Sequence, residues 1–274
     1  MSSRAMNPSQ DAAVLIPMRL GASRLPGKGL RPIGAYSSLG LLAGRLRRGS
    51  RVGSRILLCT TTESGDDPLV EVALALGLEI HRGSTDDVLL RLTEGAQRLG
   101  VAWVAEVDGD DVLCDPAHVD LALARAQATG ADYFAFNDLP FGVAANILST
   151  RALTTACARK TANDTSTGIF ATILESGAFR VVREAAGEAF RHPRARMTLD
   201  YPQDLDFFRA VVAHFPGREL DFTLSELLAL LAREPALVEL NAGLNEAYWQ
   251  HFNAKKAGDA GKPRDAGTVG VHDG

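Results

Sequence analysis

The segment IPMRLGASRLPGKGL, residues 16–30, places three cations among glycines directly after an apolar run. The cations are Arg19, Arg24 and Lys28. Such groups neutralise phosphate oxygens through charge-assisted hydrogen bonds, and glycines let backbone N–H groups approach the same oxygens. The segment is therefore suited to a polyphosphate ligand. It matches neither the P-loop pattern GxxxxGK[ST] nor GxGxxG, and a solvated, turn-rich surface loop is the alternative.

An acidic cluster, in the segment EVDGDDVLCDP, ends another apolar run. Asp108, Asp110 and Asp111 repel one another, and a bound cation would relieve that repulsion. Carboxylate oxygens suit Mg²⁺ or Mn²⁺, so the cluster is a candidate metal site, with plain solvated charge as the alternative. Asp115, which precedes Pro116, is expected to cap a helix instead.

One more acidic residue, Asp200, follows the apolar triplet MTL at residues 197–199. We predict a short strand over the triplet and a helix that opens at Pro202, so that Asp200 ends a strand as Asp110 does. Two strand-end carboxylates opposite a cationic glycine loop can hold a metal that bridges to phosphates. A helix cap is the alternative role for Asp200.

The elements that must position these residues alternate between short apolar runs and longer segments of helical period. Strands are expected at residues 12–18, 55–61, 78–83, 102–110, 132–137 and 141–150. Helices are expected at residues 38–49, 67–77, 86–100, 115–130, 151–160, 203–215 and 223–234. This alternation predicts an α/β fold with a mostly parallel sheet, whose ligands bind at the carboxyl ends of the strands.

Composition narrows the classes of partner. Of the 274 residues 46% are hydrophobic, and the formal net charge of -4 gives no general electrostatic reason to bind nucleic acid or an anionic membrane. No apolar run approaches the roughly 18 residues of a membrane span, and the three cysteines form no CxxC pair. We therefore expect a cytoplasmic protein with one domain at residues 11–253 and a disordered tail at residues 254–274.

Four segments, in this order, resemble the signatures of the sugar-acid cytidylyltransferases, which transfer CMP from CTP. They are IPMRLGASRLPGK, DDPLVEVALALGLEIHRGSTDDVLLR, GDDVLCDP and MTLDYPQDLDFF, and they span about residues 14–209. The resemblance is greatest to the branch of the spore coat polysaccharide biosynthesis protein F, with the CMP-Kdo and CMP-sialic acid synthetases as more distant relatives. It implies a Rossmann-like, three-layer nucleotidyltransferase fold with a small dimerisation or acceptor arm, and a homodimer.

The resemblance also implies roles for individual residues. The triphosphate would be held in the glycine loop by Arg19, Gly21, Ala22, Ser23, Arg24 and Lys28. The cytosine or ribose would lie near Arg82, Gly83, Ser84 and Asp87, and Asp108 would also belong to the nucleotide site. Mg²⁺ would be bound by Asp110 and Asp200. Catalysis would rest on Lys28, Arg19 and Asp110, and the sequence leaves open whether Asp108 or Asp111 joins the metal shell.

The implied reaction is attack of an acceptor oxygen on the α-phosphorus of CTP, with release of pyrophosphate. The acceptor would be a 2-keto sugar acid of the Kdo, sialic or pseudaminic type. A small phosphonate acid is the alternative acceptor, because the departures from the family pattern fall in the acceptor half: Val112 and Leu113 in the metal segment, Asn146 where relatives carry an acidic residue, and NDTSTGIF at residues 163–170. A nucleotide-binding module without catalysis is the alternative of another class.

Two further segments are less specific. The segment RHPRAR contains His192, Arg194 and Arg196, which either meet an anionic acceptor or form a solvated charged loop. The aromatic run YWQHF at residues 248–252 is expected either at a dimer interface or packed on the chain's own sheet.

Overall fold

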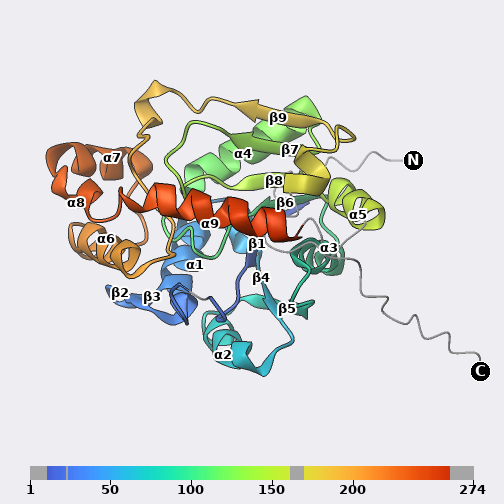
Figure 1. Cartoon of the computed structure of the whole chain (residues 1–274), viewed down its shortest axis with the longest axis horizontal. Helices are drawn as coiled ribbons and strands as arrows, with labels where there is room; N and C mark the ends of the chain where they lie inside the picture. Colours follow the sequence, from blue (N-terminus) through green and yellow to red (C-terminus); the bar gives the residue numbers. More distant parts are fainter. Residues whose placement is uncertain (1–10, 23, 161–169, 260–274) are drawn as a thin grey trace, which may run out of the picture.

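A seven-stranded sheet lies at the centre of the computed structural model, which describes residues 11–22, 24–160 and 170–259. The strands lie in the order β5-β4-β1-β6-β8-β7-β9 (Figure 1). Their bounds are β1 Ala12–Pro17, β4 Ile56–Thr61, β5 Glu79–Gly83, β6 Trp103–Glu106, β7 Tyr133–Phe136, β8 Asn146–Ser149 and β9 Val181–Glu184. A separate antiparallel pair is formed by β2 Pro32–Ile33 and β3 Tyr36–Ser37.

Parallel pairing dominates the large sheet. β1 is parallel to β4 and β6, β4 to β5, and β7 to β9, whereas β8 runs antiparallel to both β6 and β7. Every residue of β1 from Ala12 to Ile16 is buried, as expected for a parallel strand covered on both faces. The predicted α/β class with a mostly parallel sheet is confirmed.

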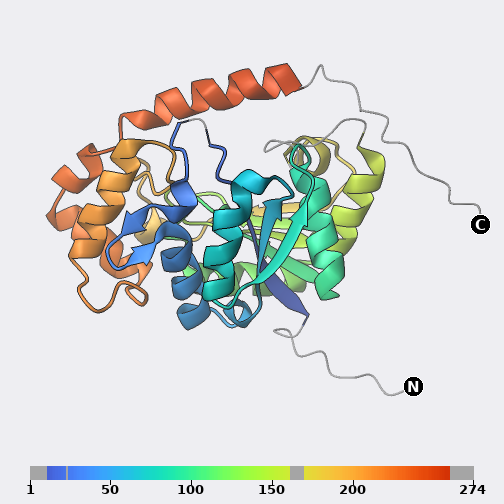
Figure 2. The ribbon, with the colours of Figure 1, turned by 90° about the horizontal axis from the view of Figure 1, so that it is seen from below.

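Helices cover both faces of the sheet, which gives the three layers visible in Figures 1 and 2. Because successive side chains of a strand point to opposite faces, Val14 packs with α1, α2 and α4, and Leu15 packs with α3 and α5. The bounds of these helices are α1 Ser38–Gly49, α2 Asp67–Ala75, α3 Val88–Leu99, α4 Pro116–Thr129 and α5 Thr150–Arg159.

The later helices pack around a hydrophobic cluster of their own. Phe207 and Phe208 of α6 (Pro202–Ala213) meet Leu227 of α7 (Leu224–Arg233) and Val238 of α8 (Ala236–Glu239). Short helical turns lie at η1 Lys28–Leu30, η2 Val52–Ser54, η3 Ser64–Asp66, η4 Phe170–Leu174 and η5 Glu188–Phe190. Within the described ranges, no helix combines the length and apolar character that a membrane span requires.

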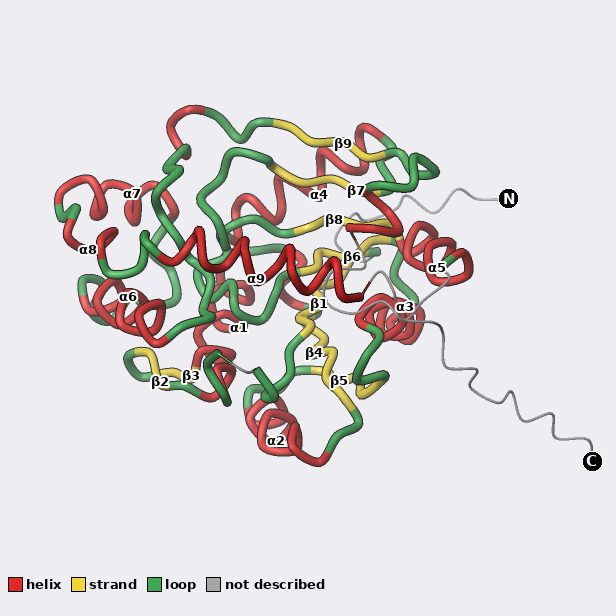
Figure 3. Tube along the Cα trace, viewed as in Figure 1, coloured by secondary structure: helices red, strands yellow, loops and turns green. Residues whose placement is uncertain are grey.

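The last helix, α9 (Leu244–Asp259), crosses one side of the molecule (Figure 2) and runs from the side of α8 toward α3 and α5 (Figure 3). It continues beyond Asn253 to Asp259, past the residue at which the predicted tail begins, while the domain boundary stays a prediction. The reason is that the residues after Asn253, in the segment AKKA, are good helix formers that extend a helix already begun. Residues 260–274, where the rest of the predicted tail falls, lie outside the described part of the chain.

The order of the strands places the candidate site. The chain passes from β1 to β4 and β5 on one side, then returns to β6 on the other side of β1. The loops that follow β1 and β6 therefore diverge at the carboxyl end of the sheet, which is where ligands bind in open α/β folds. Residues 18–27, with Arg19 and Arg24, and residues 107–115, with Asp110, occupy these two loops, and Lys28 follows the first of them directly.

The segment before Asp200 corrects a prediction, because residues 197–199 form no strand. Their hydrogen-bond partners are two loops: Met197 N donates to Phe141 O at 2.7 Å, and Leu199 N donates to Asp110 O at 2.9 Å. Gly142 permits this close approach, since its φ is +87° and a Cβ there would lie 2.3 Å from Met197 O. The strand predicted for residues 141–150 begins only at Asn146. Phe141 lies outside it and bonds through its carbonyl to Met197.

Candidate active site

The loop after β1 is held at both ends. Leu20 N donates to Asp66 Oδ1 at 2.7 Å, and Gly27 N donates to Leu20 O at 3.1 Å. Gly27 has a φ of 68°, a left-handed conformation that glycine adopts without steric cost, and the turn η1 begins at the next residue. This geometry directs the Lys28 side chain back over the carboxyl end of the sheet.

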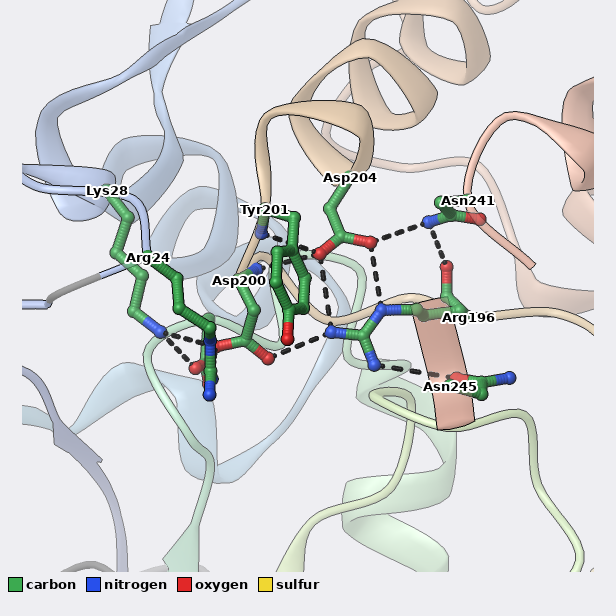
Figure 4. A network of polar contacts seen from close by, with 9 residues as sticks. Arg24, Lys28, Arg196, Asp200, Tyr201, Asp204, Asn241 and Asn245 are labelled. Atoms are coloured by element: carbon green, nitrogen blue, oxygen red, sulfur yellow. Dashed lines mark hydrogen bonds and ion pairs between the residues drawn. The ribbon is translucent and has the colours of Figure 1, made fainter. Parts of the chain in front are cut away.

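The ammonium group of Lys28 lies between two carboxylates from distant parts of the chain. It forms an ion pair with Asp110, from the loop after β6, and lies 3.2 Å from Asp200 Oδ1, at the start of α6 (Figure 4). Burial alone would lower the pKa of Lys28, but Asp110 and Asp200 raise it above its usual range. Lys28 is therefore a fixed cation at this position.

Two guanidinium groups hold the Asp200 carboxylate from either side. Arg24 donates to Oδ1 at 2.7 Å and Arg196 to Oδ2 at 2.9 Å (Figure 4). Burial would raise the pKa of Asp200, but Lys28 and then the two arginines lower it, so the carboxylate stays ionised.

Arg196 is fully buried, and further contacts fix its orientation. Its Nε donates to Asp204 Oδ1 at 2.9 Å, and Asn241 Nδ2 donates to the Arg196 carbonyl at 3.0 Å. Asp204 also accepts from the backbone N–H groups of Asp200 and Tyr201, at 2.9 Å each. Arg196 thus orients the Asp200 carboxylate from inside the protein. This role differs from both predicted alternatives, a contact with an anionic acceptor and a place in a solvated loop.

Two tyrosine rings lie against the same guanidinium groups. The Tyr201 ring centroid is 5.2 Å from Arg24 Cζ and 5.7 Å from Arg196 Cζ, and the Tyr248 centroid is 5.5 Å and 4.9 Å from them. These are cation–π distances. Burial, followed by repulsion from Asp110 and Asp200, raises the pKa of Tyr248, as expected for a phenol held close to the carboxylates. Sequence reasoning did not assign Tyr248 to the site, because α9 carries no family motif.

The carboxylates after β6 form a group of like charge. Glu106 is buried, and burial raises its pKa. Burial and the neighbouring Asp110 also raise the pKa of Asp111, and Asp108 lies exposed near the start of the loop. Asn146, where the family pattern predicts an acidic residue, donates to Glu106 Oε2 at 2.7 Å. An amide fits this position because a further carboxylate would repel Glu106.

The donor set fits a divalent metal of the Mg²⁺ type. Asp110 and Asp200 each present one oxygen atom to the Lys28 ammonium group, and the carboxylates of the loop after β6 have an excess of negative charge that a cation would offset. Across the described ranges, no three Asp, Glu, His or Cys side chains gather closely enough to form a complete metal site. A metal bound here would therefore complete its shell with water and substrate phosphate oxygens, as Mg²⁺ commonly does.

The residues predicted near the base and ribose lie on another side of the loop. Arg19 is exposed and donates to the Thr85 carbonyl at 3.4 Å, which joins the loop after β1 to the loop after β5. Arg91, which is buried, donates to the Ser84 carbonyl at 2.6 Å and fixes that second loop. Gly83 closes β5, and its carbonyl accepts from Thr62 N at 3.2 Å. The backbone of residues 83–85 is thus placed beside Arg19.

Two side chains of the same predicted group serve the fold. Arg82 donates to the carbonyls of Thr61 and Glu63, at 2.8 Å each, and so supports the turn after β4. Asp87 caps α3 by accepting from Leu90 N at 2.9 Å, and it forms a buried ion pair with Lys160. The structure does not bring these two side chains to the Lys28 cluster.

The remaining predicted residues are placed as follows. Gly21 and Ala22 lie in the loop before Arg24, and Ser23 is outside the described residues, as is most of the segment 163–170. Arg194 is exposed and pairs with Glu239 at 2.5 Å, away from Asp200. Asp115 caps α4 as predicted, accepting from His118 N at 3.1 Å.

Comparison with known proteins identifies the class and the family. A model of the family described as cytidylyltransferase matches residues 13–235. The chain is thus a nucleotidyltransferase enzyme with an α/β nucleotidyltransferase fold. It belongs to the cytidylyltransferase family, as its sequence motifs predicted.

The chain is also similar to individual known proteins, two by sequence and one by fold. The spore coat polysaccharide biosynthesis protein SpsF of Bacillus subtilis (strain 168) is 26% identical over 230 residues, which cover 82% of this chain and 95% of that protein. A 3-deoxy-manno-octulosonate cytidylyltransferase of Pseudomonas syringae pv. tomato is 35% identical over 121 residues, 41% of this chain and 44% of that one. A cytidylyltransferase structure from Leptospira borgpetersenii superposes with a TM-score of 0.77 at 22% identity, covering 83% and 96% of the two chains.

Proposed function

We propose that this enzyme transfers CMP from CTP to an acidic acceptor, a 2-keto sugar acid, and releases pyrophosphate. The observation that carries the proposal is the ion-paired group of Lys28, Asp110 and Asp200 at the carboxyl end of β1 and β6. It combines a fixed cation for a phosphate chain with two carboxylates suited to a metal. The family supports cytidine as the base, and the names of the relatives support a sugar acid as the acceptor.

The proposed step is an in-line displacement at the α-phosphorus. An acceptor hydroxyl oxygen forms a bond to that phosphorus while the bond to the oxygen bridging to the β-phosphate breaks, and its electron pair leaves with pyrophosphate. The hydroxyl proton passes to solvent. Negative charge grows on the leaving pyrophosphate, so cations in fixed positions accelerate the step.

Lys28 and Arg24 are the cations proposed for this task. Lys28 is 14% exposed and Arg24 is 24% exposed, so both are held by the protein yet open to a ligand. When CTP binds, its phosphate chain would replace the Asp110 and Asp200 carboxylates as the partner of these two cations. Arg19, at the opposite side of the loop, is proposed to meet the outer phosphates or the ribose.

A divalent metal is proposed to bind at Asp110 and Asp200. Bound there, Mg²⁺ would neutralise phosphate charge and polarise the α-phosphoryl group. The protein's own part is to keep the two carboxylates aligned. For Asp200 that part falls to the buried Arg196, which Asp204 orients in turn.

The test is a pyrophosphate-release assay with Mg²⁺. Each of CTP, UTP, GTP and ATP is paired with Kdo, sialic acid, pseudaminic acid and small phosphonates. Release confined to CTP with a sugar acid is the expected result. Pyrophosphate release with a phosphonate alone would show that the acceptor is a phosphonate acid and not a sugar acid. The absence of release with every pair would overturn the proposed reaction.

A further inference from the structure

Two arginines approach the loop after β5 from different elements. Arg19, from the loop after β1, donates through Nη1 to the Thr85 carbonyl at 3.4 Å. Arg91, from the first turn of α3, donates through Nη1 to the carbonyl of the preceding residue, Ser84, at 2.6 Å. Because their acceptors are successive carbonyls of one loop, the two guanidinium groups lie close together.

Arg91 is a buried cation with no carboxylate partner in the described part of the chain. It is 3% exposed, and its Nε is buried without a hydrogen-bond partner among the described residues. Burial lowers the pKa of the Arg91 guanidinium, and the charge of Arg19 lowers it further. Since buried charges in proteins are normally paired, this charge is suited to a negatively charged ligand.

The two carboxylates that act on Arg91 from a distance are bound to other groups. Asp66 accepts from Leu20 N at 2.7 Å, which holds the loop after β1. Asp87 forms its buried ion pair with Lys160. Neither carboxylate is therefore available to neutralise Arg91.

Other cations near the carboxyl end of the sheet are paired within the chain. Arg82 pairs with Asp67 at 2.7 Å. Lys28 and Arg24 pair with Asp200, at 3.2 Å and 2.7 Å. The positive charge beside the loop after β5 is thus left for a ligand.

We propose that Arg19 and Arg91 form a second anion site, apart from the Lys28 cluster, which binds an oxyanion of a substrate: a phosphate group of CTP or the carboxylate of the acceptor. This inference rests on the proposed cytidylyltransferase reaction, whose two substrates both carry such a group. Arg19 is exposed and would meet the ligand directly, while Arg91 adds its charge from inside the protein. A guanidinium presents its N–H groups in a fork that matches the oxygen atoms of a phosphate or a carboxylate.

The experiment measures binding by isothermal titration into the full chain. The probes are CTP, cytidine, which has the same base and ribose without phosphate, and the sugar acid that gives the highest turnover in the pyrophosphate assay, or Kdo if none does. The variants are Arg19→Met, Arg91→Met and, as a matched control, Arg98→Met. Arg98 lies on the same helix as Arg91, is exposed and donates to the Ile80 carbonyl.

For Arg19→Met and Arg91→Met we expect the Kd of one charged probe to rise roughly tenfold, as the loss of a charge-assisted contact would give. A rise for CTP without a rise for cytidine identifies the bound group as a phosphate. A rise for the sugar acid alone identifies it as the acceptor carboxylate. Arg98→Met should bind every probe as the wild type does.

Two results for the variants overturn the anion site and leave the proposed reaction standing. One is an unchanged Kd for both CTP and the sugar acid in Arg19→Met, which replaces an exposed side chain and decides the matter even if Arg91→Met fails to fold. The other is an equal loss of affinity for CTP and cytidine, because it would mean that the arginines only hold the loop in place.

Results for the wild type separate the site from the reaction. A wild-type enzyme that binds CTP but releases no pyrophosphate with any pair rejects the reaction alone, since the titrations of the variants still decide the site. A wild-type enzyme that binds neither CTP nor the sugar acid rejects both.

Discussion

The ammonium group of Lys28 and the carboxylate of Asp200 lie 3.2 Å apart although 172 positions separate them in the sequence. The contact joins the glycine loop after β1 to the start of α6 and closes the site around Asp110. Neither segment can form this site alone, so the fold must bring them together.

Replacement of Lys28 should remove most of the activity. Lys28→Met keeps the length of the side chain but takes away the cation proposed to stabilise the leaving pyrophosphate, so we expect kcat to fall roughly 100-fold or more. Arg31→Met is the control, since Arg31 lies on the same loop, is exposed and donates to the Pro26 carbonyl at 3.1 Å. Equal activity in Lys28→Met and Arg31→Met would exclude Lys28 from the reaction.

Asp200 and Asp110 should differ in their contribution to stability. Asp200 is 4% exposed and pairs with three cations, one of them the fully buried Arg196, whereas Asp110 is 22% exposed. Asp200→Asn should therefore lower the free energy of unfolding by about 2 to 4 kcal/mol, and Asp110→Asn by less, because the fully buried Arg196 loses a charged partner only in the first variant. Urea denaturation without metal measures both, and the reverse order would contradict the assigned contacts.

Gly142 should tolerate no side chain. A methyl group there would approach the Met197 carbonyl oxygen to 2.3 Å, and the φ of +87° disfavours any L-residue, so Gly142→Ala should lower the melting temperature by several degrees. It should also reduce kcat, because Met197 leads to Asp200. Gly65→Ala is the matched control, since a Cβ there meets no atom within 4 Å and its φ is not positive. Equal melting temperatures in the two variants would show that the loop can relax.

The cysteines should react with thiol reagents at different rates. Burial raises the pKa of Cys59 to about 12 and raises that of Cys114 as well, and both side chains are enclosed, whereas Cys157 is half-buried. At pH 8 the native protein should therefore show fast labelling of Cys157 only, and all three cysteines should react after unfolding in urea. Fast labelling of Cys59 in the native state would mean that the face of the sheet under α3 opens readily.

The sequence predicts the fold well, because the apolar runs and helical periods are regular from residue 12 to about residue 130. It also indicates the cations of the glycine loop and the acidic residues after β6, since their types and spacing resemble a known family. The strand predicted before Asp200 was wrong because MTL reads as a strand by composition, while its hydrogen-bond partners are loops. Composition alone does not reveal such partners.

Side-chain direction limits prediction of the rest of the site. Arg82 lies in a family signature, yet its guanidinium supports the turn after β4, a contact that only the folded chain reveals. Tyr248 shows the converse, since it lies in no signature but contacts Arg24 and Arg196 through the path of α9. A residue's chemistry can be inferred from its type, but its partners depend on the tertiary structure.

The central claim is that Lys28, Asp110 and Asp200 form a binding site for CTP and a divalent metal. Isothermal titration of CTP into the wild-type protein and Asp110→Asn, each with and without MgCl₂ and with UTP as the comparison nucleotide, tests it directly. The account predicts CTP binding that MgCl₂ strengthens in the wild type, that loses this strengthening in Asp110→Asn, and that exceeds UTP binding. Absence of CTP binding, or binding that neither MgCl₂ nor the Asp110→Asn substitution alters, would contradict it.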